Sequence, residues 1–255
     1  MIKEIAGRAT TLISPQCRFD RAIFILGHMR CGSTALSHIL CSHPEISGYG
    51  EAHVHYDGRD ALGVLTLNQL RRHALRPRAR YLFDKVLHSR YDAGPHPEFF
   101  RARAIFLVRE PAATIRSIRN LFRTIGSGEY ASDGLAADYY EERLARLIRN
   151  WDMFPPKQRM GFTYERLTSN PEAAISAISA FLELSPPLAN RYAAPAKTMA
   201  HGSGDPLASH KFKGIVENSQ ATTLGGTDRP LEIPSSRIAR LHDLYEAAFH
   251  IVTQM

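Results

Sequence analysis

The sequence predicts an α/β fold with a central parallel sheet flanked by helices, and three observations lead to this expectation. Short apolar runs rich in β-forming residues alternate with longer segments of helical periodicity. The first apolar run ends in a glycine-bounded loop that leads into a helical segment, as in the opening βα unit of a doubly wound sheet. The chain has 255 residues, 44% of them hydrophobic and 22% charged, which is enough for one large domain with a sizeable core.

Four strands are expected. The clearest is the uninterrupted apolar run 22–26, which Gly27 ends, as is typical of a strand buried on both faces of a parallel sheet. The others are expected at 81–87, at 104–108 and, from a weaker pattern, at 160–164. Apolar residues at helical spacing predict helices at 34–41, 66–75, 111–122, 135–154, 171–182 and 236–251.

The region of about 185–234 has no regular pattern and is rich in Pro, Gly, Ser and Thr. A stretch of this length is typical of a functional lid or of partial disorder. No internal repeat or low-complexity tract marks a domain boundary, so we expect a single domain over 1–255.

The composition indicates a small anionic partner. The net charge is +7 and the pI about 9.5, but the basic residues are scattered, so a polyanionic small molecule explains them as well as a nucleic acid would, and no nucleic acid is expected. Three cysteines form no disulfide set or C-x-x-C pair. No apolar run is long enough to span a bilayer, and the first residues do not resemble a secretory signal, so we expect a cytoplasmic protein.

The loop that follows the first strand carries the strongest motif. Residues 27–34, GHMRCGST, have the glycine spacing of the P-loop, G-x-x-x-x-G-K-S/T, but Ser33 stands in place of the lysine. Backbone N–H groups of such a loop and of the following helix N-terminus bind phosphate oxygens. The cation lies within the loop instead, as Arg30.

Residues 30–36 (RCGSTAL), together with the SHPE sequence at 42–45, resemble the 5′-phosphosulfate loop of sulfotransferases that use 3′-phosphoadenosine-5′-phosphosulfate (PAPS). The form with arginine is similar to that of tyrosylprotein sulfotransferases and many bacterial members. The resemblance implies a P-loop-type sulfotransferase fold. It also implies that the donor's 5′-phosphosulfate group is bound by Arg30, Cys31, Gly32, Ser33, Thr34 and Ala35.

Other segments agree with this resemblance. An apolar strand at 104–108 ends at Arg109, and Ser117 follows eight residues later; in the family, residues at these positions bind the 3′-phosphate of the nucleotide. Guanidinium groups match phosphate geometry, which makes this pairing physically reasonable. Weaker matches are Tyr164, in a Tyr-Glu-x-Leu segment near the nucleotide, and a basic loop over the 3′-phosphate formed by Lys211, Lys213 and Gly214.

Sulfuryl transfer needs a base and cations. Arg30 is the first expected cation, and Lys85, in a predicted strand and in an Asp-Lys pair similar to that of bacterial sulfotransferases, is the second. Two residues are candidates for the base. Glu51 lies 21 residues after Arg30, as the catalytic glutamate does in the tyrosylprotein enzymes, and is favoured. His88 resembles the histidine base of cytosolic sulfotransferases, although its spacing from Lys85 is three instead of two.

The pattern Glu51-x-His53-x-His55-x-Asp57 contains metal-ligand residue types, but a strand would spread them too far apart to surround one ion, so no metal is expected. The predicted function is therefore sulfuryl transfer from PAPS to a carbohydrate, small-molecule or tyrosyl hydroxyl. The alternatives are a P-loop kinase of a small molecule and a nucleotide-binding module without catalysis. The acceptor and the oligomeric state are left open by the sequence.

Overall fold

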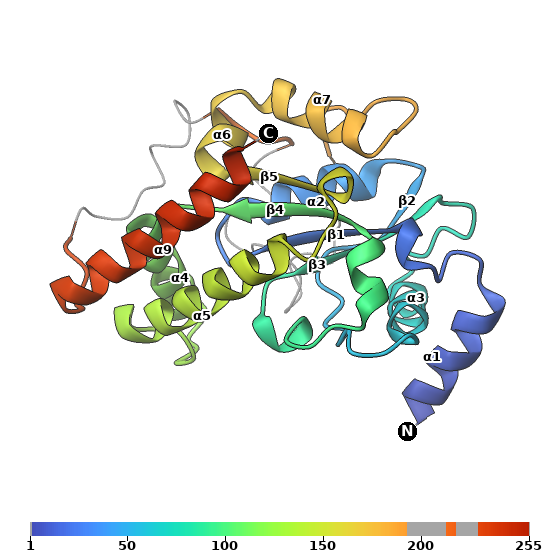
Figure 1. Cartoon of the computed structure of the whole chain (residues 1–255), viewed down its shortest axis with the longest axis horizontal. Helices are drawn as coiled ribbons and strands as arrows, with labels where there is room; N and C mark the ends of the chain where they lie inside the picture. The colour runs from blue at the N-terminus through green and yellow to red at the C-terminus, as the bar shows by residue number, and fades with distance from the viewer. Residues whose placement is uncertain (1, 193–212, 218–228, 255) are drawn as a thin grey trace.

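A five-stranded parallel sheet forms the centre of the protein, seen in a computed structural model that describes residues 2–192, 213–217 and 229–254 (Figure 1). The strand order is β2-β3-β1-β4-β5, and every neighbouring pair is parallel. The strands are β1 Ala22–Gly27, β2 Ile46–Ser47, β3 Tyr81–Val86, β4 Arg103–Val108 and β5 Arg159–Thr163. The predicted α/β class with a central parallel sheet is confirmed.

Helices cover both faces of this sheet. They are α1 Ile2–Ile13, α2 Ser33–Ser42, α3 Ala61–Arg71, α4 Pro111–Thr124, α5 Asp133–Trp151, α6 Tyr164–Ser169, α7 Pro171–Phe181 and α9 Ser235–Thr253. Short 3-10 helices lie at Phe19–Arg21, Ser89–Tyr91, Pro97–Arg101 and Pro156–Gln158. One buried cluster joins the sheet to α2, α6 and α7, and the other joins it to α3, α4, α5 and α9. In Figure 1, α6 and α7 accordingly lie on one side of the sheet and α4, α5 and α9 on the other.

The expected elements are present, with local differences. The helix expected at 66–75 begins earlier, at Ala61, and ends at Arg71, shortly before His73 adopts a left-handed φ of 54°. Helix α1 and strand β2 were not predicted from the sequence. Helix α1 packs closely on α3 because glycines meet at the crossing: a Cβ on Gly63 would lie 2.0 Å from the carbonyl oxygen of Gly7. No helix in the described ranges is long and apolar enough to span a membrane.

Strand β3 presents different chemistry to the two faces of the sheet. Because side chains alternate along a strand, Phe83 and Lys85 point toward α2, while Leu82 and Asp84 point toward the opposite layer. All six residues of β3 are buried. A lysine and an aspartate are therefore held inside the protein on opposite sides of one strand.

The carboxyl ends of the strands meet at one edge of the sheet, and the chain leaves neighbouring strands there in opposite directions. The chain continues from β1 into α2 on one face, whereas from the adjacent β4 it continues into α4 on the other face. Ligands of open α/β sheets bind in the crevice at such a switch point. The loop 28–32 and Arg109 both lie at this point.

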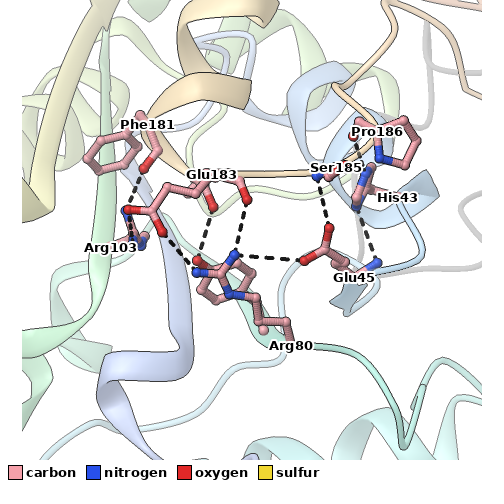
Figure 2. A network of polar contacts seen from close by, with 10 residues as sticks. His43, Glu45, Arg80, Arg103, Phe181, Glu183, Ser185 and Pro186 are labelled. Carbon is pink, nitrogen blue, oxygen red and sulfur yellow. Dashed lines mark hydrogen bonds and ion pairs between the residues drawn. The ribbon is translucent and has the colours of Figure 1, made fainter.

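The opposite, amino edge of the sheet is closed by a network of charges (Figure 2). Glu183, just after α7, pairs with Arg80 at 2.9 Å and with Arg103 at 3.0 Å. Arg80 also lies 3.9 Å from Glu45, whose other oxygen accepts a hydrogen bond from the Ser185 backbone. This network ties the starts of β3 and β4 to the end of α7.

Candidate active site

The loop after β1 turns sharply through two residues of left-handed conformation. Arg30 has a φ of 67° and Gly32, which directly precedes α2, a φ of 88°. A Cβ on Gly32 would lie 3.1 Å from the ring of Tyr164, so glycine provides both the conformation and the close approach. Helix α2 begins at Ser33, and its first N–H groups face the carboxyl edge of the sheet. The predicted phosphate loop therefore has the strand, turn and helix N-terminus that anion binding requires.

A buried arginine, Arg143, fixes the strand ends around this loop. Arg143 of α5 donates to the carbonyl oxygens of Gly27 and Val86, each at 2.8 Å, and pairs with Asp92 at 2.7 Å. Arg143 and Asp92 are both fully buried. One side chain thereby holds the ends of β1 and β3 together.

Tyr139, one turn earlier on α5, holds the loop itself. Its hydroxyl accepts a hydrogen bond from the Met29 N–H at 2.7 Å and donates one to the Leu87 carbonyl at 2.7 Å. These bonds connect the loop to the segment that follows β3. Nothing in the helical spacing of 135–154 distinguished Tyr139 or Arg143 from other core positions.

Arg30 and Arg109 lie together beside the loop. Arg30 Nε donates to Ser117 Oγ at 2.9 Å, and Arg109 Nη1 donates to the Arg30 carbonyl at 3.0 Å. The Arg109 guanidinium lies over the Tyr164 ring, 4.0 Å from its centroid. Four residues assigned to the donor site from the sequence are thus in one cluster. The direct contact of Ser117 is with Arg30, whereas the sequence paired it with Arg109.

A buried ring fixes the position of Arg109. His28 Nε2 accepts a hydrogen bond from the Arg109 N–H at 3.0 Å, so its Nδ1 carries the proton and donates to the Met29 carbonyl at 2.9 Å. Complete burial lowers the pKa of His28 to about 3, which keeps the imidazole neutral in this role. Arg109 Nε is buried and has no hydrogen-bond partner among the described residues. A donor in this state suits an additional acceptor such as a phosphate oxygen.

Lys85 and Glu51 form an ion pair next to the loop. Lys85 Nζ lies 3.2 Å from Glu51 Oε1 and donates to Thr34 Oγ1, in the first turn of α2, at 3.3 Å. The side chain of Lys85 is 1% exposed and that of Glu51 14%. A cation, a carboxylate and the anion loop are therefore joined by direct contacts, although the three residues lie far apart in the sequence.

The surroundings of Glu51 keep it ionised. Burial raises the pKa of this carboxyl, but the Lys85 ammonium and the nearby His53 oppose burial and together lower the pKa to about 2. A carboxylate with so low a pKa is a weak base at neutral pH. A group of this kind accepts a proton only transiently.

Asp84 anchors the segment that carries Glu51. Its carboxylate accepts hydrogen bonds from the Ala52 N–H at 2.8 Å and from the Tyr56 hydroxyl at 2.7 Å. The Lys85 N–H donates to the Gly50 carbonyl at 3.2 Å, so residues 50–56 are fixed to β3 on both sides of Glu51. Burial raises the pKa of Asp84 to about 7.

The second candidate base, His88, lies among aromatic rings. Its ring centroid is 5.3 Å from that of Tyr139, 6.3 Å from that of Tyr91 and 6.5 Å from that of Tyr130. Burial lowers the pKa of His88, and the nearby Glu51 carboxylate opposes this by favouring the protonated ring. Of the two candidates, Glu51 is the one that contacts Lys85 directly.

The remaining predicted site residues lie in different places. Cys31 is fully buried, and burial raises the pKa of its thiol; its Sγ lies 2.9 Å from where a Cβ on Gly27 would be. Lys213 and Gly214 lie beside Asn190 and Tyr192, and Lys213 lines a pocket of about 440 Å³ near the end of α2, away from the loop at its start. Lys211 lies outside the described residues.

The described ranges contain no candidate metal centre. Within these ranges, no group of three or more His, Cys, Asp or Glu side chains is arranged to hold a metal ion. Of the alternating pattern that starts at Glu51, only the contact with His53 brings two members together: Nε2 lies 3.7 Å from Glu51 Oε2.

The chain is similar to sulfotransferases in its sequence pattern and in its fold. A family model described as the sulfotransferase family matches residues 22–78 and 59–187. No curated protein matches the sequence significantly. The sulfotransferase domain from the curacin biosynthetic pathway has a TM-score of 0.61 at 21% identity, covering 90% of this chain and 98% of that domain.

Two further solved structures share the fold. The sulfotransferase domain of the Synechococcus PCC 7002 olefin synthase has a TM-score of 0.58 at 16% identity, covering 91% of this chain and 97% of that domain. A mouse sulfotransferase complexed with PAP has a TM-score of 0.53 at 11% identity, covering 96% of this chain and 89% of that one.

Proposed function

This chain belongs to the sulfotransferase family, and we propose that it transfers the sulfuryl group of PAPS to the hydroxyl group of an acceptor. The observation that supports this most strongly is the contact chain of Thr34, Lys85 and Glu51, which joins an anion-binding helix terminus, a buried ammonium and a carboxylate. These are the parts that a displacement at an anionic centre needs.

In the proposed donor site, the backbone N–H groups at the start of α2 and the Arg30 side chain bind the 5′-phosphosulfate. Arg109, Ser117 and Tyr164 surround the 3′-phosphate and the adjacent nucleotide. The buried Arg109 Nε, which lacks a partner among the described residues, supports this assignment because it offers a hydrogen bond to an anion.

In the proposed reaction, the acceptor oxygen attacks sulfur in line with the leaving 5′-phosphate oxygen. A new S–O bond forms, the S–O bond to the phosphate breaks, and its electron pair remains on the phosphate. Lys85 and Arg30 stabilise that charge. Glu51 accepts the acceptor proton as the new bond forms, when that proton has become acidic.

The test is to incubate the protein with radiolabelled PAPS and a panel of phenolic, alcoholic, carbohydrate and tyrosyl-peptide acceptors. We expect label in an acceptor, with release of one 3′,5′-ADP (PAP) for each sulfate transferred. Lys85→Met is the inactive control because it removes the ammonium but keeps most of the side-chain length. Transfer of phosphate from ATP with Mg²⁺, without any transfer from PAPS, would favour the kinase alternative and overturn the proposal.

A further inference from the structure

The two oxygens of Glu51 face different partners. Oε1 lies 3.2 Å from the Lys85 ammonium, on the side of the donor loop. Oε2 lies 3.7 Å from Nε2 of His53, slightly beyond hydrogen-bond distance. One oxygen is therefore held by a fixed cation and the other faces a group that can exchange protons.

His53 is held in place and is not a freely moving surface side chain. Its φ of 53° is left-handed, which is uncommon for a residue with a Cβ. Its ring stacks on that of Tyr91, with centroids 5.5 Å apart and an interplanar angle of 22°. The flanking backbone is fixed as well, because the Ala52 N–H bonds to Asp84 and the Tyr56 N–H to the Tyr91 carbonyl.

His53 also reaches solvent. Its side chain is 44% exposed, compared with 14% for Glu51 and 1% for Lys85. A proton on Glu51 would otherwise have to leave from a buried carboxylate. The imidazole at 53 lies 3.7 Å from that carboxylate and is itself exposed to water, and imidazole is the side chain that exchanges protons most readily near neutral pH.

We propose that His53 is a positioning residue that acts through Glu51 in the transfer reaction and passes the acceptor proton from Glu51 to solvent. This inference rests on the proposed function. The proton leaves the acceptor oxygen as the S–O bond forms, moves to Oε2, then to Nε2 of a neutral His53, and finally to water. The Lys85 ammonium, 3.2 Å from Oε1, lowers the pKa of Glu51, which supports this order because the carboxylate then releases the proton readily.

The chain offers a direct chemical test. His53→Gly removes the imidazole and suits the left-handed backbone better than histidine does. We expect kcat to fall by about tenfold or more, while the KM for PAPS stays unchanged. This loss should be smaller than the roughly hundredfold loss of kcat that we expect when the base itself is removed. Added imidazole should restore much of the lost rate. The assay measures PAP formed from PAPS, with a phenol and a primary alcohol in water as acceptors.

Two variants serve as controls. His55→Gly removes a histidine that contacts the same Tyr91 ring, at 5.1 Å, from the same segment, and should neither lose turnover nor respond to imidazole. In His53→Asn, the asparagine tolerates the left-handed conformation but occupies part of the space that added imidazole would need. This variant should therefore have a low kcat that imidazole does not restore.

Two results would overturn the inference. One is a His53→Gly variant with wild-type kcat; the other is a folded variant, judged by its melting temperature, whose lost rate imidazole does not restore. A wild-type protein that forms no PAP would instead overturn the proposed function, and this inference with it. The two failures are therefore distinguishable.

Discussion

The two edges of the sheet use the same charged residue types in opposite ways. At the amino edge, Arg80 and Arg103 are matched by Glu45 and Glu183, and the side chains of Arg80 and Glu183 are 42% and 61% exposed (Figure 2). At the carboxyl edge, the Lys85 ion pair with Glu51 is almost entirely buried. Arg109, also at the carboxyl edge, contacts an aromatic ring and a backbone carbonyl. The arginines at the amino edge contact carboxylates instead.

This difference separates a structural role from a ligand-binding role. Balanced, exposed charges satisfy each other and need no further partner, and each such pair contributes little to stability. At the carboxyl edge, the partly buried Arg109 keeps an Nε without a hydrogen-bond partner among the described residues, and it lies beside a helix N-terminus, so this edge favours an anion from outside. We therefore expect substitutions at the amino edge to leave turnover intact, and those at the carboxyl edge to affect folding, chemistry or nucleotide binding according to the position.

The largest effect is expected for Arg143, the buried residue that joins the carboxyl ends of β1 and β3. Arg143→Met leaves Asp92 buried without its cation and frees two strand-end carbonyls, so we expect a loss of about 3 to 5 kcal/mol in the free energy of unfolding. Denaturant unfolding measures this. The matched control is Arg240→Met, which removes an arginine that is 64% exposed and paired with Glu141. Equal losses for the two variants would show that Arg143 does not hold the edge together.

The next largest effect concerns the chemistry. Glu51→Gln keeps the size of the side chain but cannot accept a proton, so kcat should fall by about a hundredfold or more while PAPS binding stays nearly intact. Steady-state kinetics and nucleotide binding measured on the same sample test both parts.

His88→Asn is the control for this assignment. If that variant is inactive while Glu51→Gln retains near-normal turnover, the base is the histidine. If both variants lose activity together, the two residues act as a unit, and Glu51 is not the sole base.

A smaller effect is expected at the proposed 3′-phosphate site. Arg109→Ala should weaken binding of 3′,5′-ADP by roughly tenfold to a hundredfold, which corresponds to about 1.5 to 3 kcal/mol, and should weaken 5′-AMP much less. Isothermal titration calorimetry with both nucleotides measures the difference. Arg116→Ala, on α4 and bonded to the Arg229 carbonyl, is the control. An equal loss for both nucleotides would indicate a general structural role for Arg109.

The smallest effect is expected at the amino edge. Glu183→Gln removes the carboxylate shared by Arg80 and Arg103, yet turnover should be unchanged and the melting temperature only slightly lower, because the carboxylate is 61% exposed to solvent. Kinetics and a melting curve on this variant are sufficient. A large loss of turnover would remove the distinction between the two edges.

The sequence predicted the parts of the site that depend on local pattern. The apolar run before Gly27, the glycine spacing of the loop and the strand that ends at Arg109 are all local signals, and the structure has them where they were expected. Lys85 was also a sequence candidate, because a lysine inside an apolar strand is unusual. Its contact with Glu51 could not be derived from local pattern.

What the sequence could not predict are contacts made across the fold. Arg143 lies on a helix with many charged residues, and only the packing of α5 against β1 and β3 shows that it reaches two strand ends. Asp84 alternates with apolar residues in β3, and its function as the anchor of 50–56 depends on where that segment returns to the sheet. His53 was considered only as a metal ligand, because its distance to Glu51 is a property of the turn between them.

We propose that the carboxyl edge of the sheet binds a 3′-phosphorylated adenine nucleotide. Thermal unfolding of the wild-type protein with 3′,5′-ADP, compared with ATP plus Mg²⁺ and with 5′-AMP, tests it most directly. A ligand present at a hundred times its Kd stabilises the folded state by about 2.7 kcal/mol. We predict a clear rise in melting temperature with 3′,5′-ADP that the other two nucleotides do not match. Stabilisation by ATP with Mg²⁺, and none by 3′,5′-ADP, would contradict the claim.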